Sequence, residues 1–234
     1  YVGGGASMPC RDSIMDGRFP VHHHVEAHGT MGQTMNHPYS WSFKVKKNWQ
    51  GDLRDWWSLP ETLFRSNITT CAVSSASRYP APWMFNFWHE YHQPEEPDED
   101  LSTFASVEAE EVVDIGLDFL EDSREEFFLY LQFWDPHMPM QRNGEYAEEF
   151  NDMDIPEYPT EEQIRKHQDW ETKNSASAKD IESRNDLRNL YSEYRAEVNY
   201  VDQQLGRLFD YLKKQGIYEE SLIILTADHG EEFG

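Results

Sequence analysis

The chain has 234 residues, of which 38% are hydrophobic and 14% aromatic, so it can build one α/β domain with a sizeable core and is not a disordered chain. Its 44 acidic and 20 basic residues give a formal net charge of −24, which argues against a nucleic-acid partner because such a surface repels a polyanion. The same excess of acid fits a halophilic protein that stays soluble in high salt, although an ordinary acidic protein has a similar composition.

The first expected helix runs from Ser7 to Gly17. Pro9 suits the first turn of a helix and Gly17 its end. Ser7 would then lie at or just before the N-terminus, where free N–H groups and the helix dipole favour an anion. A hydroxyl there, with Arg11 four residues later, suits a nucleophile beside a positive charge, but a helix cap and a surface arginine give the same pattern.

A loop is expected from the end of this helix to Gly51, because the segment has no clear period. It contains the run His22-His23-His24 and, nearby, His28. A metal site is one interpretation of these histidines. Solvated loop residues are the favoured one.

A short helix and a strand are expected next. Ser58 is a plausible cap for a helix from residue 58 to residue 66, and the β-branched run from Ile68 to Val73 indicates a buried strand. Residues 79–100 are rich in proline, tryptophan and acid, so they are interpreted as a long surface excursion.

Apolar residues at helical spacing predict a helix over residues 107–120, and the apolar run from Phe127 to Trp134 predicts a central strand covered on both faces. His137 follows that strand in the sequence Asp135-Pro136-His137. It could donate to a charged oxygen or protonate a leaving group, or be a structural histidine. Residues 143–183 are acidic and irregular, and they are interpreted as a large insertion or lid.

A long helix is predicted over residues 187–215, with one apolar stripe and Gly216 as its end. Leu222 to Leu225 is then expected to be a buried strand that delivers Asp228-His229-Gly230. A carboxylate and an imidazole at a strand end can bind a divalent cation, and Gly230 allows a sharp turn beside it. An ordinary polar loop is the weaker alternative.

The order of these elements predicts an α/β fold with a mixed, mostly parallel central sheet flanked by helices, and a site at the carboxyl edge of the sheet. The central expectation is that Ser7 and the pair Asp228–His229 converge around one cation there.

Together the motifs resemble the sulfatase family of the alkaline phosphatase superfamily. The family signature is a nucleophile followed by x-Pro-x-Arg and soon by Gly-Arg, which here are Ser7, Pro9, Arg11 and Gly17-Arg18. Further matches follow in the expected order, at residues 58–63, 128–137, 194–206 and 222–231. The resemblance implies a single sulfatase catalytic domain over residues 1–234, incomplete at both ends.

The resemblance also implies roles for individual residues. Ser7 matches the nucleophile, which in active sulfatases is oxidised to formylglycine, so a formylglycine-generating enzyme is a possible partner. Arg11 matches the residue that holds this group, and His137 matches a histidine near the sulfate and the leaving group. Asp228 and His229 match two ligands of a divalent cation, with calcium favoured and manganese or magnesium as alternatives.

Some family positions have no counterpart here. A lysine and a histidine expected after the strand at residues 68–73 find no match, and at most Arg78 could replace one positive charge. The family's first metal-binding Asp pair lies upstream of the nucleophile, and a further lysine lies downstream of the Asp-His-Gly motif.

The leading hypothesis is hydrolysis of a sulfate ester, carried by a small molecule or a glycan. A phosphodiester, phosphomonoester or phosphonate hydrolase with unmodified Ser7 is the runner-up, and a decayed anion-binding relative without catalysis is the third. No membrane segment or signal peptide is seen, and a cytoplasmic location is slightly favoured. Two cysteines, Cys10 and Cys71, cannot form a disulfide framework.

Overall fold

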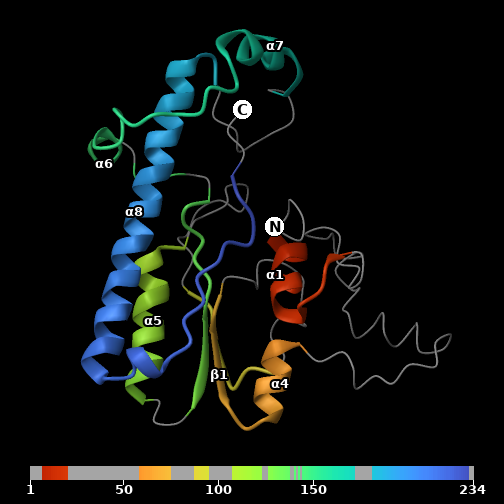
Figure 1. Cartoon of the computed structure of the whole chain (residues 1–234), viewed down its shortest axis with the longest axis vertical. Helices are drawn as coiled ribbons and strands as arrows, with labels where there is room; N and C mark the ends of the chain where they lie inside the picture. The colour runs from red at the N-terminus through yellow and green to blue at the C-terminus, as the bar shows by residue number, and fades with distance from the viewer. Residues whose placement is uncertain are drawn as a thin grey trace, which may run out of the picture. The chain divides into compact units, whose positions relative to one another are not determined.

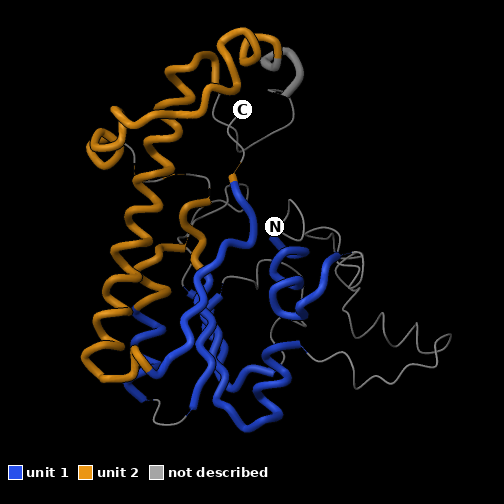
Figure 2. Tube along the Cα trace, in the orientation of Figure 1, with its two compact units in different colours: residues 1–94, 114–132, 220–230 blue, residues 95–113, 133–219, 231–234 orange. Residues whose placement is uncertain are grey.

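The protein is represented by a computed structural model. The structure describes residues 7–20, 58–74, 87–94, 107–122, 126–137, 140, 142, 144–171 and 181–231. The histidines at positions 22–24 and 28, and Arg78, lie outside these ranges. Two compact units make up the chain (Figure 2): residues 1–94, 114–132 and 220–230 form unit 1, and residues 95–113, 133–219 and 231–234 form unit 2.

A parallel sheet lies in unit 1. Its strands are β1 (Thr69–Val73), β2 (Glu90–His92) and β3 (Phe127–Leu131), in the order β2-β1-β3. Both pairings are parallel, with Cys71 beside Glu90 on one side and beside Leu129 on the other. The predicted α/β fold with a mostly parallel sheet is therefore confirmed.

Two details of the sheet differ from the prediction. Within the described residues the central strand is β1, and β3 lies at the edge with half-buried side chains. An apolar run shows that a strand is covered, but not how many neighbours it pairs with. The second difference is β2, which lies inside the segment interpreted as a surface excursion. Three residues are too short for a period to be visible.

Two helices of unit 1 formed where they were expected (Figure 1). Helix α1 (Ser7–Asp16) ends before Gly17, whose φ is 66°. Helix α4 (Leu59–Arg65) begins at Ser58, whose side chain accepts a hydrogen bond from the backbone N–H of Glu61, and it packs against β1.

Helix α5 (Ala109–Asp122) covers one face of the sheet with its second half. A Cβ on Gly116 would lie 3.0 Å from a methyl group of Leu131, so the absence of a side chain allows the close approach of helix and strand. Phe119 and Phe127 meet edge to face with their ring centroids 6.0 Å apart. Leu129, Leu131 and Phe127 therefore point to the face that α5 covers.

Unit 2 is built on the 32-residue helix α8 (Arg184–Gln215). Ser183 caps its N-terminus by accepting from Asp186 N–H, and Gly216 ends it with a left-handed φ of 74°. The short helix α6 (Glu145–Glu148) packs against α8, and α7 (Glu161–Glu171) lies earlier in the same unit. The segment interpreted as irregular, residues 143–183, thus contains two helices. A 3₁₀ turn, η4, follows α8 at Tyr218–Glu220.

The prediction of a buried strand at Leu222–Leu225 is wrong. These four residues form no strand, and their side chains are exposed, from 39% for Ile223 to 88% for Leu222. A strand needs a neighbour with free N–H and C=O groups, and no strand pairs with this run in the part of the chain that the structure describes.

No disulfide joins Cys10 and Cys71, and both thiols are buried. Burial, with a smaller contribution from the charge of Glu90, raises the pKa of the Cys71 thiol to about 12, so this thiol is uncharged at neutral pH. Among the described helices, none combines the length and the apolar character that a membrane crossing requires.

Candidate functional site

Ser7 and His229 are 222 residues apart in sequence and in direct contact in unit 1. The Oγ atom of Ser7 lies 2.9 Å from Nε2 of His229. On its other side the imidazole places Nδ1 2.8 Å from the carbonyl oxygen of Gly230. Since a carbonyl only accepts, Nδ1 carries the proton in the neutral imidazole, and Nε2 of this form accepts a hydrogen bond from the Ser7 hydroxyl.

Arg11 joins the same two ends of the chain. Its Nε donates to Oδ2 of Asp228 at 3.0 Å, and its side chain is only 5% exposed. The other carboxylate oxygen, Oδ1, accepts from the backbone N–H of His229 at 2.9 Å. The ion pair therefore fixes the carboxylate beside the imidazole, and both lie next to the N-terminus of α1.

Gln132, just after β3, completes the surroundings of Arg11. With its amide oriented by the hydrogen-bond network, the oxygen accepts from both terminal nitrogens of Arg11, at 2.6 and 2.8 Å, and the nitrogen donates to Ser74 Oγ. All three guanidinium nitrogens are then bonded. A buried arginine held in this way is a fixed positive charge and a positioning group rather than a mobile ligand.

This group also includes Ser74 and Tyr91, and neither they nor Gln132 were expected there from the sequence. Tyr91 donates its hydroxyl to the carbonyl oxygen of Ser74 at 3.0 Å. Tyr130 is also close: burial raises its pKa to about 12, partly opposed by the charge of Arg11. Alternation along the strands could have located them. Side chains at even-numbered positions, such as Ser74, Tyr130 and Gln132, lie on the face of the sheet opposite to Leu129 and Leu131.

The donor atoms of this cluster suit a divalent cation. Oδ1 of Asp228 and Nε2 of His229 are 3.9 Å apart, and carboxylate oxygen and imidazole nitrogen are both common metal ligands. A carboxylate has lone pairs left after the bonds to Arg11 and to the His229 N–H. Two donors do not fill the coordination shell of such a cation, so further ligands have to come from other residues or from water.

His137 belongs to unit 2, and its predicted catalytic role stays a prediction. Its backbone N–H donates to the carbonyl oxygen of Trp134, and the two rings have centroids 4.8 Å apart. Its neighbour Asp135 is structural: Oδ2 accepts from the backbone N–H of Ala109 at 2.9 Å, at the first residue of α5. That bond satisfies one of the free donors of the helix N-terminus.

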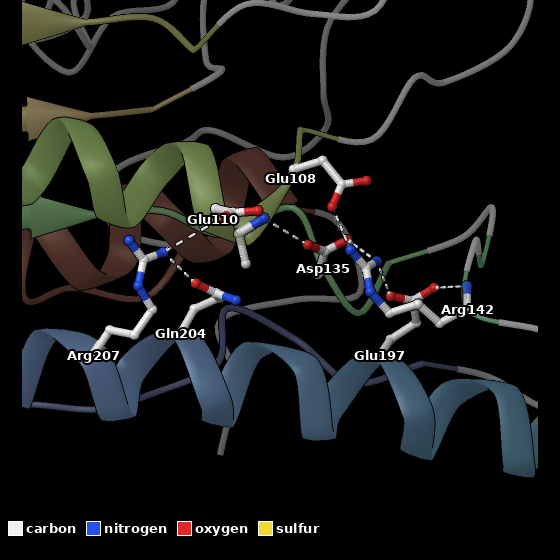
Figure 3. A network of polar contacts seen from close by, with 8 residues as sticks. Glu108, Glu110, Asp135, Arg142, Glu197, Gln204 and Arg207 are labelled. Carbon is white, nitrogen blue, oxygen red and sulfur yellow. Dashed lines mark hydrogen bonds and ion pairs between the residues drawn. The ribbon is translucent and has the colours of Figure 1, made fainter. Parts of the chain in front are cut away.

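A polar network surrounds Asp135 in unit 2 (Figure 3). Arg142 donates to Glu197 Oε2 at 2.6 Å, also pairs with Glu108, and lies over the ring of Tyr200. Its Nη1 is 3.8 Å from Oδ1 of Asp135. Burial raises the pKa of Asp135 to about 7, although the bond from Ala109 and the charge of Arg142 lower it.

Comparison with known proteins identifies relatives of the chain. The model of the family described as Sulfatase matches residues 1–234. An arylsulfatase of Clostridium perfringens (strain 13 / Type A) is 28% identical over 127 residues, which cover 53% of this chain and 26% of that protein. The multifunctional alkaline phosphatase superfamily protein PehA of Trinickia caryophylli is 28% identical over 123 residues, covering 46% of this chain and 24% of that protein.

Among solved structures, the phosphonate monoester hydrolase of Agrobacterium radiobacter superposes with a TM-score of 0.62 at 15% sequence identity. The match covers 93% of this chain and 52% of that chain. The chain thus shares its fold with this enzyme and spans about half of its length. It spans about a quarter of the length of the two curated relatives.

Proposed function

The chain belongs to the sulfatase family, and from this membership we propose that it acts as a metal-dependent hydrolase of sulfate esters with Ser7 as its nucleophile. The observation that carries the proposal is the contact of the Ser7 hydroxyl with His229, beside the ion pair of Arg11 with Asp228. A nucleophile is useful only where a base, an oriented charge and room for an anion meet, and this cluster offers the first two.

The N-terminus of α1 is a favourable position for the anion to bind. Its first turn contains no acidic side chain, and it begins at Ser7 itself, so the helix dipole favours a negatively charged group beside the hydroxyl. Ser7 is 3% exposed and Arg11 is 4% exposed. Charges in such a site interact more strongly than they do in water, which matters in a chain of net charge −24 that has to attract an anion.

Asp228 and His229 would hold the divalent cation, for which calcium is proposed, with manganese or magnesium as alternatives. When bound, this cation supplies positive charge that offsets the charge of the sulfate oxygens. The hydrogen bond from Arg11 holds the Asp228 carboxylate beside His229, where both side chains would bind the cation. The role of His137, assistance to the departing alcohol, rests on its sequence context alone.

A second candidate is supported by one observation. The Ser7 hydroxyl donates to the unprotonated Nε2 of His229, which is an arrangement that activates an unmodified serine as an alkoxide. That chemistry suits a phosphodiester, phosphomonoester or phosphonate ester. Nε2 has a single lone pair, so it can accept the Ser7 proton or bind the cation, but not both at once. The sulfatase candidate therefore uses Nε2 of His229 as a metal ligand, whereas the candidate with an unmodified serine uses it as the base for Ser7.

Parallel assays of an aryl sulfate, an aryl phosphate and an aryl phosphonate monoester, with each divalent cation, test the proposal. We expect sulfate ester turnover that falls at least about a thousandfold in Ser7→Ala. Ser13→Ala is the matched control: it makes the same change in the same helix, and the Ser13 hydroxyl donates to the carbonyl oxygen of Pro9 within that helix. It should keep full activity.

Mass spectrometry of residue 7 in protein from its native host separates the remaining outcomes. Formylglycine at this position with sulfate turnover supports the sulfatase. An unmodified serine with faster turnover of phosphorus esters reverses the ranking. No turnover, together with anion binding that is unchanged in Ser7→Ala, identifies a non-catalytic anion-binding protein.

A further inference from the structure

We propose that Cys71, Glu90 and His92 form a second metal site, which takes a borderline-soft divalent cation such as Zn²⁺ and clips strand β2 to strand β1. This site is independent of the proposed function and uses none of its residues.

The register of the sheet brings the three side chains to one face. Cys71 on β1 is aligned with Glu90 on β2, and aligned residues of parallel strands point to the same side. His92 is two residues after Glu90, so it points to that side as well. Leu129, the partner of Cys71 on β3, points to the face covered by α5. The three candidate ligands therefore share that face, at the β2 side of the sheet.

The candidate ligand atoms are close enough for one cation. The Cys71 Sγ, a Glu90 carboxylate oxygen and a His92 ring nitrogen all lie within 4.8 Å of one another. Metal distances of about 2.0–2.3 Å place neighbouring ligands of a tetrahedral zinc about 3.3–3.8 Å apart. Glu90 Oε2 and His92 Nε2 are already 3.1 Å apart. Bringing the Cys71 sulfur to these separations from the other two ligand atoms therefore needs a movement of at most about 1.5 Å.

The mixture of ligands selects the kind of metal. A thiolate, an imidazole and a carboxylate are the three side-chain ligands of zinc, whereas calcium and magnesium take oxygen ligands almost alone. With Cys71 and Glu90 both ionised, the two negative charges balance one divalent cation. On binding, the S–H bond of Cys71 breaks, the sulfur binds the metal, and the proton passes to solvent.

Burial differs among the three ligands in a way that suits a structural clip. Cys71 is fully buried, while the side chains of Glu90 and His92 are 49% and 41% exposed. The cation would thus have a fixed anchor on the central strand, two ligands on the short edge strand, and a side open to water for a fourth ligand. Since β2 has only three residues, a metal bond to two of them would contribute much of its attachment.

The Ser7 cluster lies on the other face of the same sheet. Gln132 and Tyr130, which lie beside Arg11, have the opposite parity to Leu129 and hence to Cys71. A metal at Cys71 is therefore separated from Ser7 by the sheet itself, and the two sites can be examined one at a time.

Cobalt titration of the metal-free full chain tests the site, because a thiolate bound to Co²⁺ gives a near-ultraviolet charge-transfer band that oxygen and nitrogen ligands do not give. We expect this band to saturate at one equivalent, to be removed by Zn²⁺ and to survive an excess of Ca²⁺. The band should be lost in Cys71→Ser and kept in Cys10→Ser, which changes the other buried thiol. No band in the folded wild type, or a band that persists in Cys71→Ser, overturns the proposal.

A second pair of variants covers the case in which Cys71→Ser does not fold. Glu90→Gln and His92→Gln change half-exposed side chains, and each should weaken Co²⁺ binding at least about tenfold while the circular dichroism spectrum is unchanged. Glu126→Gln, at an exposed position before β3, is the matched control and should bind Co²⁺ like the wild type. Unchanged affinity in both Glu90→Gln and His92→Gln would also overturn the site.

Discussion

Asp135 illustrates how burial changes the chemistry of a single residue. The residue is 5% exposed and its side chain is bonded to the N-terminus of α5, and burial raises its pKa from 3.8 to about 7. Between these values the folded protein keeps a proton that the unfolded chain releases. The unfolded state therefore binds fewer protons in this window, and Asp135 lowers the free energy of unfolding as the pH rises from about 4 to about 7.

Asp135→Asn should remove this dependence, because an amide oxygen can still accept from Ala109 N–H but the side chain no longer titrates. Each pKa unit corresponds to about 1.4 kcal/mol, so we expect the stability curve of the variant to diverge from that of the wild type by about 1 kcal/mol per pH unit in the window. Urea unfolding at several pH values between 4.5 and 7.5 measures it. The exposed residue Asp118 on α5 supplies the control, Asp118→Asn, which should follow the wild type. Parallel curves for Asp135→Asn and the wild type would contradict the prediction.

At the residue scale, Ser7 meets His229 as the order of the motifs led us to expect, although the strand that was expected to deliver Asp228–His229 to the sheet edge does not form. The sequence could not predict Gln132, since nothing in an isolated glutamine indicates that its amide faces a buried guanidinium. The cluster of Cys71, Glu90 and His92 was hidden for a similar reason. It depends on a strand register that sequence alone does not give.

At the element scale, the long helices were predictable because each carries an apolar stripe and clear ends. One position in α8 shows the limit of that pattern. Val198 continues the apolar spacing of Val201 and Leu205 and is expected to be buried, but it is 44% exposed, and the neighbouring Glu197 is 1% exposed instead. Glu197 can occupy that position because Arg142 pairs with it. A periodic pattern counts apolar residues, so it misses a buried carboxylate with a distant partner.

The run Leu222–Leu225 shows the corresponding limit for strands. The four consecutive apolar residues predicted a buried strand, but they form no strand and are exposed in the described structure. Strand formation depends on a partner edge elsewhere in the molecule, but a helix satisfies its own backbone groups. Short apolar runs are therefore weaker predictors than long periodic ones.

A glycine inside α8, Gly206, and the glycine that ends it, Gly216, allow a matched test of the helix interior and the helix end. Gly216→Ala places a Cβ on a residue with φ of 74°, so we expect a loss of about 1 kcal/mol in the free energy of unfolding. Gly206→Ala makes the same change inside the helix, where a Cβ would meet no atom within 4 Å, and should add up to about 1 kcal/mol. Denaturant unfolding of both variants measures the difference. Changes of the same sign would show that the helix does not end at Gly216 in solution.

At the scale of the whole molecule, the charge of −24 is the dominant property. Acidic side chains outnumber basic ones by more than two to one, 44 against 20, so the basic side chains are too few to pair one to one with the carboxylates. Exposed ion pairs such as that of Lys166 with Glu162 contribute little to stability. Repulsion among the unpaired carboxylates favours the expanded chain over the folded one, and dissolved salt weakens that repulsion.

We therefore expect the unfolding temperature to rise as KCl increases from about 0.05 M to about 1 M, over which range the screening length falls from above 10 Å to about 3 Å. Thermal unfolding followed by circular dichroism, with the divalent cation held constant, measures the effect. An uncharged osmolyte at matched osmolality is the control, because it leaves the electrostatic repulsion unscreened. If stability depends on screening, KCl stabilises the protein beyond the osmolyte, and the steepest rise comes at the lower salt concentrations. An unfolding temperature that is flat or falls with KCl would mean that the carboxylates are paired or dispersed well enough for their repulsion not to matter, and it would remove the physical basis for interpreting the composition as an adaptation to high salt.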